Sequence, residues 1–287
     1  MTIADTVVDW YHENKRDLPW RRHGFTPWGT LVSEFMLQQT PVARVIPRLD
    51  EWLTRWPTPA DLAAVPPGEA VRAWKSLGYP RRALWLHACA VAITERHDGV
   101  VPEDVDALLA LPGIGDYTAR AVAVFAYGNR HPVVDTNIRR VIARAIDGQG
   151  EPGPPSAKRD LVAMETLLPA GRPAAAAFNA GMMELGAIVC VARTPRCDEC
   201  PLREVCAWRL AGSPPYDGPR KTVQKKYEGS DRQVRGLILA ELRASHIPVT
   251  PGEIAGVWPD AVQRERALAG LLADGLAVET PDGYVLP

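Results

Sequence analysis

The sequence has few features of membrane or secreted proteins. No stretch approaches the about 18 uninterrupted apolar residues of a transmembrane helix, and the N-terminus lacks the basic-then-apolar pattern of a signal peptide. Strand-type alternation is nearly absent before residue 270. The formal net charge of −1 excludes a uniformly basic nucleic-acid coat protein, so any DNA binding must use local patches. We therefore expect a soluble, cytoplasmic, all-α protein without membrane contact.

Cysteine is also scarce, but four of the five cysteines lie in one stretch with the spacing Cys190-x6-Cys197-x2-Cys200-x5-Cys206. Four thiolates so close in sequence can hold one compact inorganic centre, and iron–sulfur clusters take thiolate ligands. Structural zinc sites usually pair two CxxC knuckles, and disulfides need an oxidising compartment. The spacing favours one [4Fe–4S] cluster, with zinc as the alternative. Cys89, in an apolar helical run, is expected to be an ordinary buried thiol.

Proline and glycine divide the chain into successive helices. Thr26-Pro27 predicts the start of a helix that ends near Gln39, and Thr40-Pro41 precedes another that ends near Trp56. Further helices are predicted over 59–64, 68–76, 81–97, 103–110, 116–127, 136–146, 156–167 and 173–188. Residues 211–230 form a Pro-, Gly- and Lys-rich linker. Residues 231–287 predict three helices (231–244, 251–257, 260–274) and a terminal hairpin, as in a small winged-helix-like domain.

A glycine-containing turn, Leu111-Pro112-Gly113-Ile114-Gly115, separates two of the predicted helices. Glycine permits a tight turn with close backbone approach, and the next helix begins with unsatisfied N–H groups. Such a hairpin can bind a DNA phosphate without reading sequence. The same residues also suit a simple helix–helix connection, and the turn alone does not decide between the two.

Two carboxylates have surroundings that favour different protonation states. Glu34 lies on an otherwise apolar helix, where burial would raise its pKa and let it hold a proton at neutral pH. Asp135, before Thr136 and Asn137, has the position of a helix N-cap, which favours the ionised form. Each could be structural, as a paired buried glutamate and an ordinary N-cap. Together, a protonated Glu and an ionised Asp form the pair that cleaves glycosidic bonds.

The motifs together carry a family resemblance. In chain order, SEFMLQQT, W-x-S-LGY, LPGIGDYTA, VVDTNIRRV and the cysteine spacing resemble the MutY adenine DNA glycosylases of the helix–hairpin–helix family, which includes endonuclease III. The resemblance spans about residues 5–210. It implies a two-lobed DNA glycosylase fold with an iron–sulfur cluster loop. Residues 21–127 would form a six-helix barrel with the hairpin, and residues 1–20 would pack with a cluster lobe, 128–210.

The resemblance also implies residue roles. Glu34 matches the acid that protonates adenine N7, and Asp135 matches the carboxylate that stabilises the sugar cation, with Tyr117 and Asn137 beside it. Gln39 and Tyr79 match residues that wedge into the stack opposite the flipped base. The full set of implied substrate and DNA contacts is Trp20, Arg21, Gln38, Gln39, Tyr79, Leu111, Gly113, Gly115, Arg193 and Arg196. The iron ligands are Cys190, Cys197, Cys200 and Cys206.

The implied function is removal of adenine mispaired with 8-oxoguanine or guanine, by base flipping and monofunctional hydrolysis of the N-glycosidic bond. The partner is double-stranded DNA with that mispair, and we expect a monomer. The usual C-terminal domain, which resembles nucleotide pyrophosphohydrolases and reads 8-oxoguanine, is not evident in 231–287. That segment is a candidate for clamping the duplex or for binding a protein partner, and we expect less strict discrimination of 8-oxoguanine from guanine.

The sequence departs from the family pattern at Pro80, where a second tyrosine is usual, and at Ser76, where glycine is usual. Three alternatives remain. A thymine/uracil mismatch glycosylase of the same superfamily is disfavoured by Glu34 within its LQQT context. An endonuclease III-type lyase needs a lysine where Tyr117 stands. A non-catalytic iron–sulfur DNA-binding protein would use both carboxylates only structurally.

Overall fold

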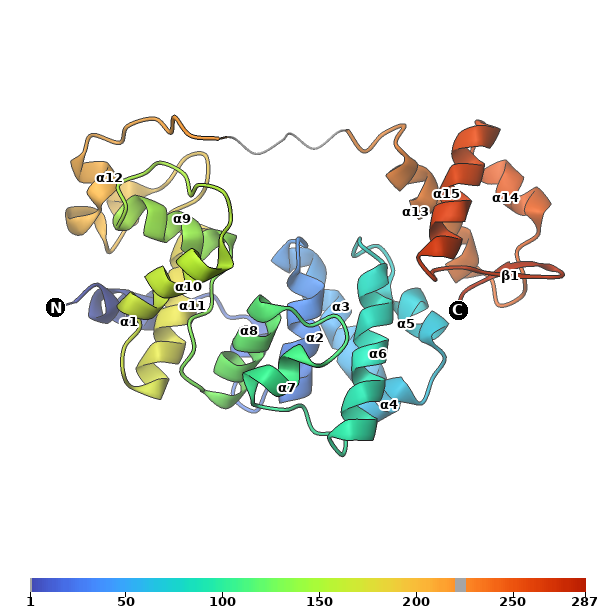
Figure 1. The fold of residues 1–287 in the computed structure, drawn as a ribbon, viewed down its shortest axis with the longest axis horizontal. Helices are drawn as coiled ribbons and strands as arrows, with labels where there is room; N and C mark the ends of the chain where they lie inside the picture. Colours follow the sequence, from blue (N-terminus) through green and yellow to red (C-terminus); the bar gives the residue numbers. More distant parts are fainter. Residues whose placement is uncertain (1, 220–225) are drawn as a thin grey trace. The chain divides into compact units, whose positions relative to one another are not determined.

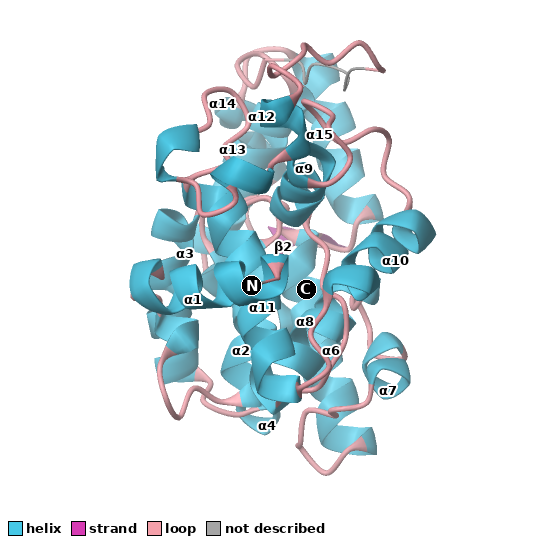
Figure 2. Ribbon diagram, turned by 90° about the vertical axis from the view of Figure 1, so that its left-hand side faces the viewer, coloured by secondary structure: helices cyan, strands magenta, loops and turns pink. Residues whose placement is uncertain are grey.

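The computed structural model describes residues 2–219 and 226–287, and the regular structure of the described chain is mostly helical (Figure 1, Figure 2). The helices before the linker are α1 (Ile3–Asn14), α2 (Pro27–Leu37), α3 (Val42–Arg55), α4 (Pro59–Ala63), α5 (Pro67–Trp74), α6 (Arg81–Arg96), α7 (Val105–Leu109), α8 (Asp116–Tyr127), α9 (Thr136–Ala145), α10 (Ala157–Leu167), α11 (Arg172–Ile188) and α12 (Ala207–Leu210). After it come α13 (Asp231–Ala244), α14 (Pro251–Val257), α15 (Ala261–Ala273) and the antiparallel strands β1 (Val278–Thr280) and β2 (Gly283–Val285). The predicted all-α class is confirmed.

The helix boundaries follow local capping chemistry. The Gly29 N–H donates to Thr26 Oγ1 at 3.0 Å, so Thr26 caps α2 as predicted. α2 ends at Leu37, two residues before the predicted end, because Gln39 takes a left-handed conformation (φ 54°). α7 begins only after Asp104, whose Oδ1 accepts from the backbone N–H groups of residues 106 and 107. The other predicted boundaries lie within one or two residues of those observed.

The chain divides into two compact units. The first comprises Met1–Thr30, Glu103–Leu109 and Ile114–Lys221, and the second comprises Leu31–Pro102, Ala110–Gly113 and Thr222–Pro287. In the first unit α11 packs against both α1 and α9, around a buried core that includes Val7, Ile138, Phe178 and Leu185. Burial of such side chains is the main force that holds these helices together. The division into domains expected from the sequence stays a prediction.

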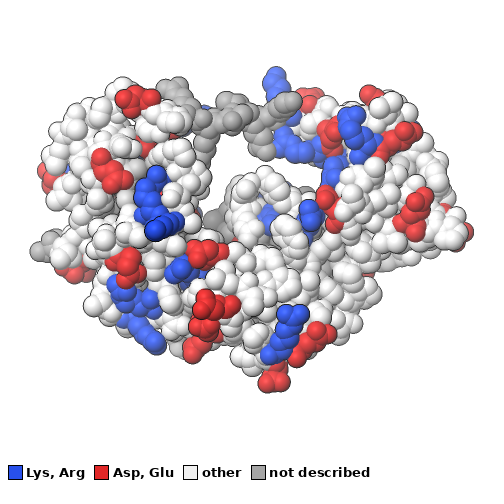
Figure 3. Space-filling view, viewed as in Figure 1, with Lys and Arg blue, Asp and Glu red and all other residues white. Residues whose placement is uncertain are grey.

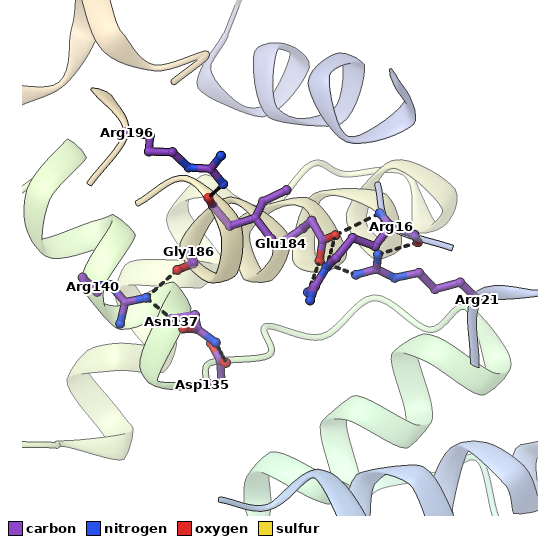
Figure 4. A network of polar contacts seen from close by, with 9 residues as sticks. Arg16, Arg21, Asp135, Asn137, Arg140, Glu184, Gly186 and Arg196 are labelled. Atoms are coloured by element: carbon purple, nitrogen blue, oxygen red, sulfur yellow. Dashed lines mark hydrogen bonds and ion pairs between the residues drawn. The ribbon is translucent and has the colours of Figure 1, made fainter. Parts of the chain in front are cut away.

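A buried carboxylate joins the segment after α1 to α11. Glu184 is fully buried and accepts from Arg16 at 2.8 and 2.7 Å and from Arg21 at 2.8 Å (Figure 4). These charge-assisted hydrogen bonds lower the pKa of Glu184 to about 2, against the opposing effect of its burial. The ion pairs fix the short 3₁₀ turn Pro19–Arg21, which carries Trp20.

In the second unit α4 and α5 pack against α6, over a core of large apolar side chains. Trp52 is buried and makes edge-to-face contacts with Trp56 and Trp74, at centroid distances of 4.7 and 5.7 Å. Glu34 lies on α2 in this unit, among fully buried neighbours such as Val32 and Phe35.

The C-terminal part of the second unit consists of α13, α14, α15 and the β1–β2 hairpin, as predicted, and α13 packs against α14 and α15. It contacts α5: Arg243 Nε donates to the Val71 carbonyl at 2.9 Å, Arg72 donates to the Arg243 carbonyl, and the Gly68 N–H donates to the carbonyl of Pro287. A Cβ on Gly68 would lie 2.4 Å from that carbonyl oxygen, so the contact requires glycine.

The predicted linker contains no helix or strand in its described residues, 211–219 and 226–230. Three basic residues of this segment, Arg220, Lys221 and Lys225, lie outside the described part of the chain. No helix in the described ranges is long and apolar enough to cross a membrane.

Candidate active site and cysteine loop

Asp135 stands at the N-terminus of α9 in the first unit. Its Oδ1 accepts from the Ile138 N–H at 2.7 Å, which is the predicted N-cap hydrogen bond. Its Oδ2 accepts from Asn137 Nδ2 at 2.8 Å. The side chain is thus held from both oxygens in one orientation, and the residue remains partly accessible.

A chain of hydrogen bonds runs from Asp135 toward the cysteine loop (Figure 4). Asn137 Oδ1 accepts from Arg140 Nη2 at 2.8 Å, and the same guanidinium donates to the carbonyls of Gly186 and Cys190 at 2.5 and 2.7 Å. A Cβ on Gly186 would lie 2.7 Å from the Asn137 carbonyl oxygen, so α11 and the start of α9 meet closely here.

Burial raises the pKa of Asp135 above its ordinary value, whereas the hydrogen bonds from Ile138 and Asn137 and the charge of Arg140 act in the opposite direction. The expectation from the N-cap position considered only the stabilising side of this balance. Burial has the larger effect, so the pKa of Asp135 is raised overall. The Asn137 amide is one of the groups that lower this pKa and so favour the ionised carboxylate.

Glu34 is buried, with 7% of its surface exposed, on the second unit's α2. The hairpin turn after α7 reaches this helix, because a Cβ on Gly113 would lie 3.2 Å from Phe35 Cε1 and 2.6 Å from Trp85 Cβ. Gly113 has a positive φ of 76°, so both its conformation and its surroundings require glycine. The predicted close backbone approach at this turn is therefore observed.

Arg82, which the sequence did not single out, organises the loop after α2. It is buried (3% exposed), and its Nη1 donates to the carbonyls of Phe35 at 2.8 Å and Gln38 at 2.6 Å. Its Nη2 donates to the Gly78 carbonyl at 2.9 Å, and its guanidinium lies over the Tyr79 ring at 5.3 Å. One side chain therefore connects the loops of both predicted wedge residues, Gln39 and Tyr79.

Both wedge candidates are exposed and have strained backbones. Tyr79 is 51% exposed with φ of 48°, and exposed Gln39 has φ of 54°. A non-glycine residue in this region is maintained only when its surroundings impose it, and such residues are frequent at functional sites. Gln38, beside them, is half-buried.

The start of α8 is the segment for which the sequence predicts a phosphate site. Gly115 occupies its N-cap without a side-chain hydrogen bond, and a Cβ on this glycine would meet no atom within 4 Å. The N-cap residue therefore contributes no side-chain hydrogen bond to the helix and leaves open space at its Cβ position. Leu111 is buried, and Tyr117, in the first turn of α8, is half-buried.

The four clustered cysteines come together in the first unit. One pocket is lined by Cys190, Cys197, Cys200 and Cys206, and none of them forms a disulfide. Cys89 is buried elsewhere and is also a free thiol. Among the described residues, no group of three His, Cys, Asp or Glu side chains has the arrangement that holds a single metal ion.

Arg144 is a second buried arginine that the sequence did not reveal as special. It is 4% exposed and donates to the carbonyls of Gly150 at 2.8 Å, Val191 at 2.8 Å and Ala192 at 2.9 Å. Its Nη1 also lies 3.5 Å from Cys190 Sγ. The cysteine loop is therefore attached to α9 through this guanidinium.

The predicted DNA contacts of the first unit differ in accessibility. Arg193 is exposed, and exposed Arg196 pairs with Glu199 at 3.2 Å and donates to the Ile188 carbonyl. Arg21 is engaged with Glu184, and Trp20 is half-buried. The roles assigned to all site residues stay predictions.

Comparison with known proteins identifies the class. The family described as HhH-GPD superfamily base excision DNA repair protein matches residues 32–164, and the iron–sulfur binding domain of endonuclease III matches residues 190–206. The adenine DNA glycosylase of Mycobacterium tuberculosis is 54% identical over 288 residues, which cover 99% of this chain and 94% of that protein. The thymine/uracil-DNA glycosylase of Pyrobaculum aerophilum is 36% identical and covers 72% of this chain and 91% of its own. The solved structure of a thermostable thymine-DNA glycosylase matches with a TM-score of 0.66 at 30% identity, covering 72% of this chain and 95% of that chain.

Helical fold, hairpin and cysteine loop together define a helix–hairpin–helix DNA glycosylase with an iron–sulfur binding domain. Sequence identity distinguishes between the adenine and the thymine/uracil glycosylases of this class. The mycobacterial adenine DNA glycosylase has a higher identity to this chain than the thymine/uracil enzyme, and its match extends over nearly the whole chain, including residues 231–287. The chain belongs to the adenine DNA glycosylase family of the HhH-GPD superfamily.

Proposed function

We propose that this enzyme removes adenine mispaired with 8-oxoguanine or guanine from double-stranded DNA and leaves an abasic site. The observation that carries the proposal is the presence, in a chain of this family, of a buried Glu34 and a hydrogen-bonded Asp135 N-cap. Cleavage of an N-glycosidic bond needs both a proton for the leaving base and a negative charge near the sugar.

Glu34 supplies the proton. Adenine is a poor leaving group while its ring stays unprotonated, and protonation at N7 turns it into a neutral leaving group. The apolar neighbours of Glu34 disfavour its ionised form, so the carboxyl can enter the reaction with its proton. General acid catalysis of this kind typically contributes about 10²–10⁴-fold in rate.

Asp135 stabilises the cation that develops at C1′ as the bond breaks. The hydrogen bonds from Ile138 and Asn137 orient its oxygens before substrate arrives, so no reorganisation is needed during the reaction. Tyr117 and Asn137 support this step, and water then attacks C1′. Trp20 lines the adenine pocket, and Arg21 and Gln38 contact the substrate or the DNA.

DNA is bound through phosphate contacts and base flipping. The N-terminus of α8, with Leu111, Gly113 and Gly115 in the preceding turn, binds a phosphate. Arg193 and Arg196 add phosphate contacts from the cysteine loop. Gln39 and Tyr79, exposed on strained loops, fill the space that the flipped base leaves.

Cys190, Cys197, Cys200 and Cys206 hold one [4Fe–4S] cluster. Their four side chains line one pocket, and thiolates are the ligands that such a cluster would take there. When bound, the cluster would close the loop that carries Arg193 and Arg196.

Release of free base from four duplexes tests the substrate assignment. The enzyme should release adenine from duplexes with 8-oxoguanine:A and G:A, and no base from G:T and G:U. Release of thymine or uracil instead would support the thymine/uracil alternative. Borohydride trapping provides a second test: efficient covalent capture at the rate of excision would contradict a monofunctional mechanism, because Tyr117 offers no amine for a Schiff base.

A further inference from the structure

A basic groove in the second unit lies outside the machinery assigned above, except that Gln38, Gln39 and Tyr79 form part of its wall. Its volume is about 1320 Å³, and its lining residues come from the loops around α6 and from the C-terminal helices, mainly α13. Eight of the described lining residues are Lys or Arg, whereas Asp274 is the one acidic residue among them. A chain with a net charge of −1 therefore concentrates positive charge here.

The basic side chains come from both sides of the groove. Arg44, Lys75 and Arg81 project from the α2–α6 part, and Arg232, Arg235 and Arg243 from α13. The three α13 arginines are spaced by three and eight residues, so they share one face of the helix. In Figure 3, blue Lys and Arg side chains lie in the region of α13 and α15, with red Asp and Glu side chains among them.

Acidic residues neutralise part of this charge, because Lys75 pairs with Glu51 at 2.8 Å and Arg72 pairs with Glu69 at 3.2 Å. Residues 226–287 contain six Lys or Arg and nine Asp or Glu, so the segment as a whole is acidic. Asp231, however, pairs with Arg266 outside the groove, at 2.7 Å. Asp274 pairs with both Arg81, at 3.2 Å, and Arg235, and so connects α6 to α13.

Exposed aromatic side chains accompany the arginines. Trp85 is 40% exposed, Tyr227 is 57% exposed, and the Arg81 guanidinium lies over the Trp85 ring at 5.2 Å. Interleaved cations and aromatic rings are typical of surfaces that bind a nucleic-acid strand. Between the arginines, α13 presents the exposed small residues Gly236 and Ala240, which let a backbone approach the helix closely.

We propose that this groove binds the phosphate backbone of the DNA strand opposite the excised adenine, and that residues 226–287 serve as a clamp for that strand. The inference rests on the proposed function, because Gln39 and Tyr79 are assigned there to the base that remains in the opposite strand. Phosphates next to that base reach the groove whose wall these two residues form. The distance from Arg232 to Arg243 along α13 is about 16 Å, which corresponds to about five nucleotides of one strand.

Charge removal on the two helices of the C-terminal segment tests the proposal. The test variant is Arg232→Gln with Arg235→Gln, and the matched control is Arg264→Gln with Arg266→Gln, which removes the same charge on α15 outside the groove. Affinity is measured between about 50 and 200 mM salt for a duplex with a tetrahydrofuran abasic analogue opposite 8-oxoguanine. The slope of log Kd against log salt should fall by about 1–2 in the test variant and stay unchanged in the control.

Arg44→Gln, on the side of the groove opposite α13, gives a second test that does not depend on contacts of α13. It should lower the salt slope by up to about 1. Methylphosphonates in the 8-oxoguanine strand should weaken binding of the wild type about tenfold and of the Arg232/Arg235 variant little further. Methylphosphonates in the other strand should affect both proteins equally.

Wild-type salt slopes in both groove variants would overturn the proposal. If groove variants with wild-type salt slopes still release adenine normally, the proposed function stands, and the groove becomes a candidate site for a protein partner instead of DNA. If the wild type releases no adenine from any duplex, the proposed function fails, and the salt slopes still decide whether the groove binds DNA.

Discussion

Asn137 donates a 2.8 Å hydrogen bond from Nδ2 to Asp135 Oδ2, and its own Oδ1 accepts from Arg140. The amide thus orients the proposed catalytic carboxylate and is itself oriented by a guanidinium that contacts the cysteine loop. Since burial raises the pKa of Asp135, the ionised form depends on such donors.

This dependence predicts a change in the pH profile. Asp135 acts when ionised, so excision is lost as pH falls through its pKa in the folded protein. Asn137→Ala removes a group that lowers this pKa, so the acidic limb of the single-turnover rate should move to higher pH. Thr136→Ala, at an exposed neighbouring position, should leave the limb in place. Identical profiles for all three proteins would show that Asn137 does not act on the carboxylate.

Arg82 should be needed for both stability and the wedge loops. Arg82→Lys keeps the charge but cannot reproduce the contacts of the guanidinium to four backbone carbonyls and the Thr40 hydroxyl. We expect a loss of about 3 kcal/mol in the free energy of unfolding, measured by urea titration. At temperatures where the variant is folded, the excision rate should fall more than the DNA affinity. Arg96→Lys, at the exposed end of the same helix, serves as the control, and equal effects of the two substitutions would contradict this account.

Glu184 should contribute stability that disappears in acid. The folded-state pKa of about 2 lies below the ordinary value of 4.5, so the contribution is complete above about pH 4.5 and is lost as pH falls toward 2. Glu184→Gln should lower the free energy of unfolding by about 3–5 kcal/mol at pH 7, because Arg16 and Arg21 lose a buried partner. The difference from wild type should shrink at pH 3. Glu165→Gln breaks the exposed pair with Arg130 and should cost less than about 1 kcal/mol.

Arg144 should govern retention of the cluster. Arg144→Gln removes donors to three carbonyls and to Cys190 Sγ, so the loop should open more readily. Purified wild type should contain about four irons per chain, and the variant should contain fewer and lose its visible absorbance faster in air. Arg172→Gln, at the start of α11, should behave as wild type. Stoichiometric zinc in anaerobically purified wild type would overturn the cluster assignment.

The sequence predicted the helices well because their ends depend on local chemistry. Thr26-Pro27 and Asp135 act within three residues of themselves, so their effect is visible without knowledge of the fold. The cysteine spacing is equally local, since all four thiols come from one short loop.

The buried arginines could not be predicted in this way. Arg82 and Arg144 look like their neighbours Arg81 and Arg139 in the sequence, and scattered arginines are usually on the surface. Several of their partners are backbone carbonyls 44–48 residues distant in the chain, which no side-chain pattern indicates. The basic groove escaped prediction for the same reason, because its charges meet only when α13 lies beside α6.

The central claim is that Glu34 protonates adenine, and single-turnover excision from an 8-oxoguanine:A duplex by Glu34→Gln tests it most directly. The glutamine is nearly isosteric but has no acidic proton, so the rate should fall by about 10²-fold or more, while affinity for the abasic-analogue duplex stays within about threefold of wild type. Glu51→Gln, at an exposed position on α3, should retain the full rate. A Glu34→Gln enzyme that keeps more than about a tenth of the wild-type rate would contradict the assignment of Glu34 as the catalytic acid.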